Sequence, residues 1–227
     1  VNWVNDWPMV GVDGKGVVTY RKPDVGKKYP IKELPTSDDF NETNLGMQWG
    51  WNHNPVPDKW SLSNKPGYLR LKTAKVVDSL PKARNTLTQR IFAKYDQTIP
   101  TKGITSLKTG SMKDGDIAGL AVFQKPYAYI AVQKENGNRK LIMVNDGKTI
   151  DSVPMKGETV YLRATASNHT EKASFGYSYD NKEFTQLGNE LNMQFSLDIF
   201  TGNKFCLFNF PTKETGGHVD FDWFKMR

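Results

Sequence analysis

The stretch IAGLAVFQKPYAYIAVQKENGNRKLIMV, residues 117–144, decides the fold class. Its first eight residues, 117–124, are apolar enough for a β-strand that is covered on both faces. Two further segments, 127–133 and 139–144, flank the tetrapeptide ENGN at 135–138, in which Asn-Gly is a strong signal for a β-hairpin. The stretch therefore predicts three successive short strands.

Short strands between turns continue on both sides of this stretch. No segment holds a long period of 3.6 residues, and the 227 residues include 12 Phe, 9 Tyr and 6 Trp, which is typical of β-sheets. We therefore expect an all-β protein, a two-sheet antiparallel jelly-roll sandwich. Further strands are expected at 68–72, 86–91, 159–166, 173–179, 184–185, 196–200, 205–210 and 218–224.

Residues 1–36 differ in composition from the rest of the chain. They hold four of the 12 prolines and a charged stretch at 21–28, which predicts an arm or linker with a short strand at its start, ahead of a sandwich at 37–227. The first residues show neither a basic region nor a continuous apolar run, so no signal peptide is expected. A mature product or a piece of a longer protein is the expected origin.

Charge and cysteine content narrow the classes of partner. Lys and Arg number 31 against 24 Asp and Glu, a net charge of +7, but they are spread along the chain without a run of five. Nucleic acid is therefore not expected as a partner, and no apolar run approaches the ~20 residues of a membrane helix. The charge fits better with acidic, uronate-bearing plant polysaccharide. The one cysteine, Cys206, is expected to be buried and inert.

The first candidate site is aromatic and lies in QWGWNHNPVPDKW, residues 48–60. Trp49 and Trp51 are two residues apart, so they share one face of a strand. One interpretation is core packing. The other is a platform on which sugar rings stack, with Asn52 and His53 in the following loop to bind hydroxyl groups.

The second candidate site is a polar strand face. In ARNTLTQRI, residues 83–91, alternation places Arg84, Thr86, Thr88 and Arg90 on one side. That side is either an ordinary solvated sheet face or the floor of a polar ligand groove. The groove would also include Gln124, Tyr127 and Tyr129.

The third candidate site is acidic. Asp220 and Asp222 share one face of a strand about 7 Å apart, and Asp38 and Asp39 stand where the sandwich begins. The first and last strands of a jelly roll often pair, which would bring these carboxylates together as ligands for calcium. The alternative is that they are strand-end charges that face solvent.

A glycosidase pair is a further interpretation of Asp220 and Asp222. Their spacing falls in the range of inverting enzymes, but two aspartates on one strand leave no cleft for a scissile bond. The glutamates are scattered, and no nucleophile or metalloprotease motif is present. The residues themselves give little support to catalysis.

Six motifs resemble a known family, the C-terminal domain of family 43 glycoside hydrolases. These enzymes are β-xylosidases and α-L-arabinofuranosidases, and the domain is a concanavalin A-like β-sandwich. The resemblance runs in order from about Asp38 to Phe224, and NDWPMVGVDGKG, residues 5–16, resembles the end of the catalytic propeller and the link after it. The motifs are QWGWNHNPVPDKWSL, PGYLRLKT, ARNTLTQRIF, AGLAVFQKPYAYI, FSLDIFTGNKFCLFNF and GGHVDFDWF.

The resemblance implies a role without catalysis for this chain. In the family, two Asp and one Glu on the propeller carry out the reaction, and none of them maps onto this sequence. The chain is therefore expected to be inactive alone. The sandwich packs against the propeller and can shape its pocket with a loop, related modules bind xylan, and a structural Ca²⁺ lies at the sandwich edge, where Asp39 and Asp220 match the ligands. An extracellular or periplasmic location in a bacterium is favoured.

Three functions follow as alternatives. The preferred one is a carbohydrate-binding or pocket-forming accessory module that acts with a propeller on xylan or arabinoxylan oligosaccharides. The others are a stand-alone glycosidase that uses the sandwich carboxylates, and a purely structural docking domain for a propeller. The expected carbohydrate-binding residues are Trp51, Asn52, His53, Arg84, Arg90, Gln124 and Tyr127.

Overall fold

The structure is a computed structural model that describes residues 1–227 except 22–25, 27–28, 31–33, 93–97, 196 and 198–199. The chain divides into two compact units, Val1–Glu33 and Leu34–Arg227. In the first unit, β1 (Asn2–Val4) and β2 (Trp7–Met9) form a two-stranded antiparallel hairpin.

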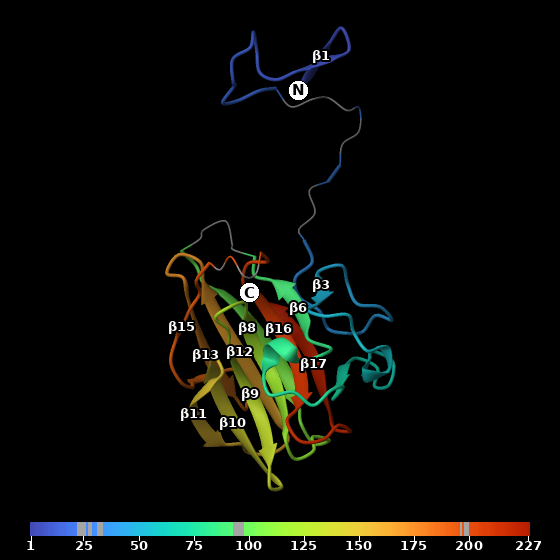
Figure 1. Ribbon diagram of the computed structural model, residues 1–227, viewed down its shortest axis with the longest axis vertical. Helices are drawn as coiled ribbons and strands as arrows, with labels where there is room; N and C mark the ends of the chain where they lie inside the picture. Colours follow the sequence, from blue (N-terminus) through green and yellow to red (C-terminus); the bar gives the residue numbers. More distant parts are fainter. Residues whose placement is uncertain (22–25, 27–28, 31–33, 93–97, 196, 198–199) are drawn as a thin grey trace. The chain divides into compact units, whose positions relative to one another are not determined.

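The second unit consists of two antiparallel sheets that face each other (Figure 1). The predicted all-β sandwich is confirmed. One sheet has seven strands in the order β11-β10-β9-β8-β16-β6-β3, and the other has eight, in the order β14-β13-β12-β7-β17-β5-β4 with β15 beside β13. The described strands are β3 (Trp49–Trp51), β4 (Trp60–Ser61), β5 (Leu69–Lys72), β6 (Leu87–Arg90), β7 (Thr101–Lys108), β8 (Asp116–Phe123), β9 (Ala128–Glu135), β10 (Asn138–Asn145), β11 (Lys148–Pro154), β12 (Thr159–Ser167), β13 (Lys172–Ser178), β14 (Thr185–Gln186), β15 (Leu191–Asn192), β16 (Lys204–Pro211) and β17 (His218–Met226), and two 3-10 helices are η1 (Pro57–Lys59) and η2 (Leu80–Lys82).

The stretch at 117–144 forms three neighbouring strands, β8, β9 and β10. Its Asn136-Gly137 turn has φ of 49° and 77°, the left-handed conformation that an Asn-Gly hairpin needs. Every residue of β8 is buried, because the strand lies inside the sheet and apolar side chains cover both of its faces. The expectation of a doubly covered strand is confirmed.

The sequence did not indicate β7 and β11, and β7 lies in the middle of the eight-stranded sheet between β12 and β17. Its inner face carries Gly103 opposite the Phe205 ring, and a Cβ on that glycine would lie 3.0 Å from the ring. Because a glycine stands where an apolar side chain would face the core, β7 shows no clear apolar alternation, and the strand was not predicted. The strand expected at 196–200 lies largely outside the described residues.

Two apolar clusters are built on the two faces of the seven-stranded sheet. Leu120 of β8 joins the core between the sheets, whereas Ala121 joins a second cluster on the outer face. Leu80 of η2 is fully buried in this second cluster, so the segment around η2 covers the outer face. Cys206 is fully buried there, as expected, and burial raises the pKa of its thiol.

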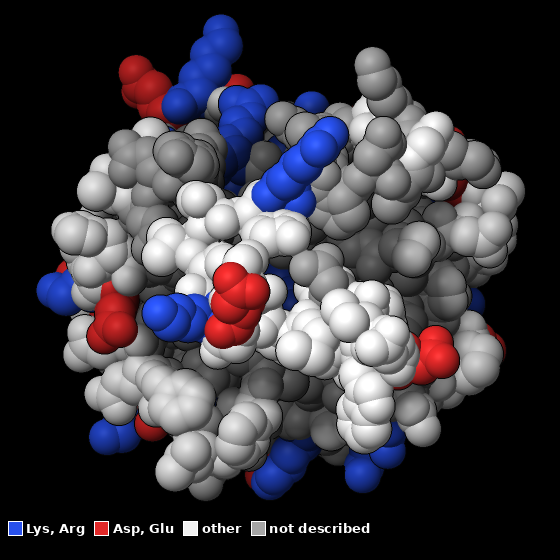
Figure 2. Space-filling view, turned by 90° about the horizontal axis from the view of Figure 1, so that it is seen from above, with Lys and Arg blue, Asp and Glu red and all other residues white. Residues whose placement is uncertain are grey.

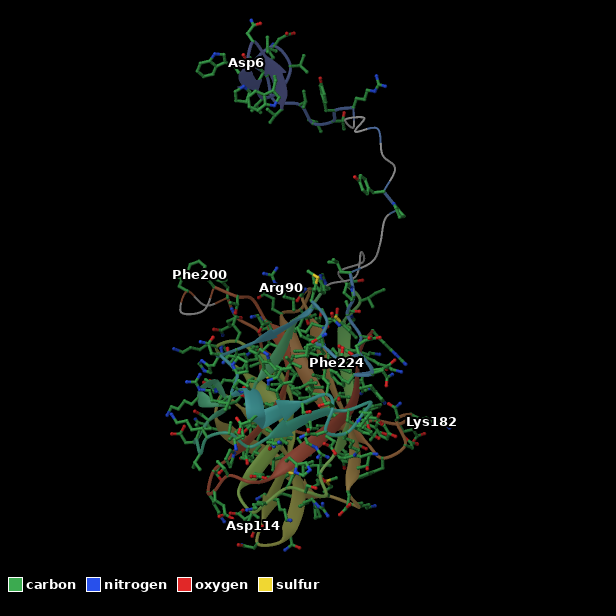
Figure 3. The ribbon with its side chains drawn as sticks, turned by 90° about the vertical axis from the view of Figure 1, so that its right-hand side faces the viewer. Asp6, Arg90, Asp114, Lys182, Phe200 and Phe224 are labelled. Carbon is green, nitrogen blue, oxygen red and sulfur yellow. The ribbon has the colours of Figure 1, made fainter. Side chains whose placement is uncertain are left out.

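The start of the sandwich pairs with its last strand, as expected for a jelly roll. Asp38 exchanges two backbone hydrogen bonds with Phe224, and the amide of Met226 donates to the Ser37 hydroxyl at 3.1 Å. The segment before Ser37 therefore joins the sandwich at the end where β17 finishes. In Figure 3, Arg90 and Phe200 mark this end, and Asp114 marks the opposite one.

Candidate functional site

The tryptophans of β3 lie half-buried against the core rather than free on the surface. The indole of Trp49 lies 5.3 Å from the Phe224 ring, edge to face, and its Nε1 donates to the Asp38 carboxylate at 2.8 Å. The Trp51 and Trp60 rings lie 5.2 Å apart, and both pack on the core. These contacts agree with the core-packing interpretation of the aromatic motif.

The loop after Trp51 is attached to the segment before β6. Asn52 donates its amide to the Thr86 carbonyl, and His53 Nε2 lies 2.8 Å from the Pro81 carbonyl. Arg84 donates to the carbonyl of Asn54 at 3.3 Å. The structure thus brings four expected sugar-binding residues together, and three of them contact backbone carbonyls.

Asn85 holds the same two loops together, a role that the sequence analysis did not identify. It is buried, its φ is 55°, and its side-chain amide both accepts from the Val56 amide at 2.8 Å and donates to the Val56 carbonyl at 3.1 Å. An asparagine in the left-handed region of backbone space is the one available signal. Dihedral angles are visible only in the structure.

The polar face expected on β6 is covered. Thr86 and Thr88 are buried, and their hydroxyls donate to the carbonyls of Ala83 and Gly50. Tyr127 belongs to the second apolar cluster, where its ring stacks on Tyr129 and burial raises the pKa of its hydroxyl. This face is therefore not an open groove.

The remaining two expected residues lie nearer the end where β17 finishes. Arg90 is exposed and pairs in register with Lys204. Gln124 is buried and lines a cavity of about 260 Å³ at that end, together with Asn168, Glu171 and Met193. Sugar binding by the seven residues stays a prediction.

Asp220 is held by cations of the protein itself. One carboxylate oxygen accepts from Arg70 Nε at 2.7 Å, and the other accepts from Arg70 and from Lys65 Nζ at 2.9 Å. Burial alone would raise the pKa of Asp220, but the hydrogen bonds from Arg70 and Lys65 outweigh it and the pKa is lowered. Asp220 is therefore a stable anion inside a charge cluster.

The calcium site expected at Asp39 and Asp220 stays a prediction. Both oxygens of Asp220 already bind Arg70 and Lys65, which leaves a poor ligand for a cation, and Asp39 is exposed. Across the described part of the chain, no group of three or more His, Cys, Asp and Glu side chains gathers as metal ligands would. Thermal melting with calcium and with chelator tests the prediction directly.

The glycosidase interpretation of Asp220 and Asp222 gains nothing from the geometry. The register of β17 against β7 shifts between Phe221 and Phe224, so the alternation on which their shared face was based is interrupted. With its lowered pKa, Asp220 is ionised at neutral pH and has no proton to donate to a leaving group.

The end of the sandwich where β17 finishes exposes large apolar side chains. They come from the segments before β3, after β6, before β7 and before β16, which the strand register brings to the same end. We call this set the apolar end. Its members are Met47 at 100% exposure, Phe92 at 36%, Ile99 at 46%, Phe195 at 76%, Leu197 at 72% and Phe200 at 83%.

Two antiparallel sheets packed face to face, with large apolar side chains exposed at one end, define the class of this domain as a β-sandwich module. Residues 37–227 match the family model of the β-xylosidase C-terminal concanavalin A-like domain. The chain therefore belongs to this family of glycoside hydrolase family 43 C-terminal domains, and the resemblance read from the motifs is confirmed.

Curated relatives are longer proteins. The chain is 32% identical to a β-xylosidase of Formosa agariphila over 99% of its own length and 41% of that protein. It is 28% identical to a non-reducing end α-L-arabinofuranosidase of Bacteroides ovatus over 100% of its length and 44% of that protein. The chain thus spans about two fifths of these relatives.

Solved structures agree. A bifunctional family 43 protein of Bacteroides eggerthii matches all of this chain with 36% identity and a TM-score of 0.83, and the match covers 30% of that chain. A family 43 enzyme engineered for endo-xylanase and exo-arabinofuranosidase activity matches with 34% identity and a TM-score of 0.84, over 48% of its own chain.

Proposed function

We propose that this chain is the non-catalytic accessory sandwich of a family 43 enzyme, and that its apolar end docks against the catalytic propeller. The exposed side chains of that end carry the proposal. Scattered exposed apolar residues are ordinary, but six large ones gathered at one end of a domain mark an interaction surface.

The way the chain enters the sandwich supports this partner. Ser37 and Asp38 pair with the finish of β17, so the polypeptide that precedes the sandwich enters at the apolar end. The β-xylosidase relative is more than twice as long as this chain. Because the matching family model describes a C-terminal domain, the additional residues of that relative include the part of the protein that precedes this domain. A covalently linked neighbour is held close to this surface, which favours docking even through a modest interface.

The apolar end also carries a cavity with the elements of a sugar pocket. The cavity of about 260 Å³ beside Gln124 is lined by the polar side chains Asn168 and Glu171 and by the exposed ring of Phe195. Polar groups beside an aromatic ring are the elements of a carbohydrate site. We therefore propose that the Phe195 ring helps to close the pocket in which the propeller acts on xylan-type oligosaccharides.

Docking is tested by mixing this chain with the catalytic part of the F. agariphila relative, expressed separately, and measuring complex formation by calorimetry and size exclusion. The double variant Phe195→Ser and Phe200→Ser is expected to bind at least about tenfold more weakly, because two exposed aromatic anchors are lost. Ile150→Ser is the matched control, since Ile150 is 42% exposed on β11. Failure of the unaltered chain to bind, or equal binding by the double variant, overturns the proposal.

A further inference from the structure

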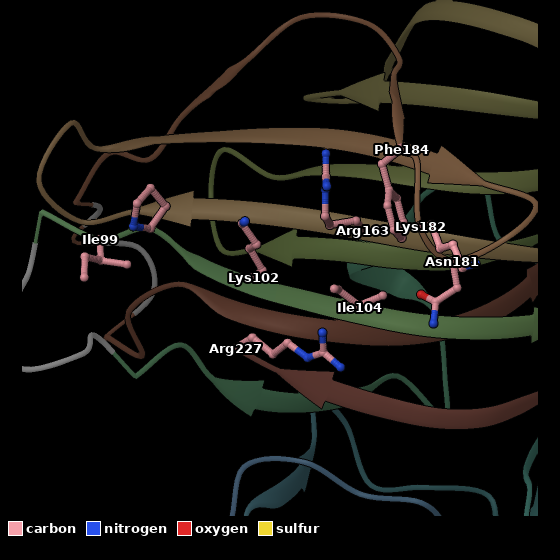
Figure 4. A pocket seen from close by; sticks show the side chains of 9 residues that line it. Ile99, Lys102, Ile104, Arg163, Asn181, Lys182, Phe184 and Arg227 are labelled. Atoms are coloured by element: carbon pink, nitrogen blue, oxygen red, sulfur yellow. The ribbon is translucent and has the colours of Figure 1, made fainter.

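The outer face of the eight-stranded sheet carries a cavity of about 320 Å³ that none of the expected site residues lines. Lys102 and Ile104 of β7, Arg163 of β12 and Arg227, which follows β17, come from neighbouring strands in register. Figure 4 shows Arg163 beside Phe184, with Lys182 and Asn181 from the same turn closing one side. We call this the cationic groove.

Four cations of the cationic groove lack a carboxylate partner. Lys102, Arg163, Lys182 and Arg227 form no ion pair with any Asp or Glu side chain in the ranges that the structure describes, and no acidic side chain lines the groove. Two carboxylates flank this turn along the chain. Asp180 accepts from the Ser178 hydroxyl and from backbone amides of its own turn, and Glu183 is exposed and forms no ion pair with a described residue.

The same sheet face shows what an internally neutralised cluster looks like. Arg70 and Lys65 lie farther along this sheet, and the protein supplies Asp220 to both of them. At the cationic groove, no Asp or Glu side chain of the described residues plays this part. Arg163 is half-buried, and burial lowers the pKa of its guanidinium, the direction expected for a cation that has lost water without gaining a partner.

The groove is built to hold Arg163 in place. The Phe184 ring lies 4.4 Å from the guanidinium carbon and stacks on it, which fixes its plane. Gly176 is the residue opposite Arg163 on β13, and the Thr185 backbone packs where a side chain at that position would stand. Ile104 contributes an apolar floor between the cations.

We propose that the cationic groove binds a carboxylate-bearing sugar, a uronic acid residue of an acidic glycan. An arginine fork binds a carboxylate with two parallel hydrogen bonds, and Lys102 and Lys182 add charge on either side. The side-chain amide of Asn181 can bind hydroxyl groups of the sugar. The volume of the groove lies at the lower end of the range for ligand sites, about 300–1,000 Å³.

A sugar acid suits this groove better than a polyanion chain. On the end of the molecule that Figure 2 shows, basic and acidic side chains are interspersed. Along the chain, Lys and Arg are spread without a run of five, which does not favour a nucleic acid backbone as the ligand. The choice of a glycan rests on the proposed function in xylan-type chemistry. The groove shares Ile99 with the apolar end, but neither Phe195 nor Phe200 lines it, so the docking variants and the groove variants test the two sites independently.

The test is a calorimetric titration of the full chain with a glucuronic acid-substituted xylo-oligosaccharide, with neutral xylotetraose as the matched ligand. The acidic ligand is expected to bind at least about tenfold more tightly, and more weakly as salt is added. Arg163→Gln is expected to lower the affinity at least about tenfold, Arg163→Lys less, and Lys102→Gln a few-fold. Lys148→Gln, at an exposed lysine of β11, is the control that leaves the affinity unchanged.

Thermal melting and amide spectra confirm that each variant is folded. Equal affinity for the acidic and the neutral ligand, or unchanged affinity in Arg163→Gln, overturns the proposal. Inorganic phosphate or single-stranded DNA that binds through Arg163 as tightly as the uronate ligand also overturns it, because the groove would then be a general anion site. If the docking experiment fails, the titration still tests uronate binding. If the titration fails, the proposal that the apolar end docks against the propeller is not affected.

Discussion

The two sheets of the sandwich have opposite outer faces. The outer face of the seven-stranded sheet is sealed by a second apolar cluster under the segment around η2, where Leu80 and Phe208 are fully buried. The outer face of the eight-stranded sheet remains open and carries charged side chains such as Arg163 and Asp220. The polar residues near β6 pointed to the sealed face, whereas the cationic groove lies on the open one. A pattern of polar residues locates a strand face, but the cover over that face decides whether a ligand can reach it.

The largest expected effect on stability comes from removing a buried side chain under η2, where the outer face of the seven-stranded sheet is covered. Leu80→Ala is expected to lower the free energy of unfolding by about 2–5 kcal/mol, because it removes buried apolar volume and leaves a cavity under η2. Chemical denaturation measures the loss. A change below about 0.5 kcal/mol, the size typical of surface positions, would show that η2 does not seal this face.

A buried carboxyl group at the start of β8 gives the next effect on stability. Asp116 is fully buried, one of its oxygens has no hydrogen-bond partner among the described residues, and burial raises its pKa to about 6. The fold therefore favours the protonated form. The stability that this preference contributes is complete below the unfolded pKa of about 3.9 and is lost as pH rises through about 6.

Asp116→Asn tests this assignment. The asparagine oxygen can still accept from the Lys113 amide, so the variant is expected to be more stable than the unaltered chain at neutral pH by about 1–3 kcal/mol, and to lose the fall in stability between pH 4 and 6. Melting temperatures across this pH range measure it. An unchanged pH profile would contradict the raised pKa.

The paired charges of the open face give a smaller effect on the free energy of unfolding, and here the substitution lowers stability instead of raising it. Asp220→Asn is expected to lower the free energy of unfolding by about 1–2 kcal/mol at neutral pH, because Arg70 and Lys65 lose their anion while remaining partly solvated. The lowered pKa of Asp220 means that its contribution is present above the unfolded pKa and is lost as pH falls through the folded one. The variant should therefore be less sensitive to acid, and equal acid sensitivity would contradict the assignment.

The unpaired charges of the open face give the smallest effect on stability. Lys102→Gln is expected to change the free energy of unfolding by less than about 0.5 kcal/mol, since Lys102 is exposed and has no anionic partner among the described residues. A clear gain in stability would indicate repulsion among the groove cations. A clear loss would reveal a structural role for this lysine and would weaken the contrast between the two faces.

Local patterns predicted most of the strands. β8, β9 and β10 were expected because apolar runs and an Asn-Gly turn report on neighbours along the chain. β7 was missed because its inner face carries Gly103, which the distant Phe205 ring requires. The cationic groove was missed for a similar reason. Its residues are single charges on separate strands, and only the register of β7, β12 and β17 makes them neighbours.

The all-β class, the family and the neighbouring strands around the Asn-Gly turn can be predicted from the amino-acid sequence alone. These depend on side-chain alternation and turn conformation, which are local, and on motifs that stand in order along the chain. Tertiary structure decided which sheet face is sealed, which carboxylate is neutralised and which end is apolar. Each of these depends on contacts between residues far apart in the chain, such as Asp220 with Arg70 and Leu80 with the cluster around Phe208.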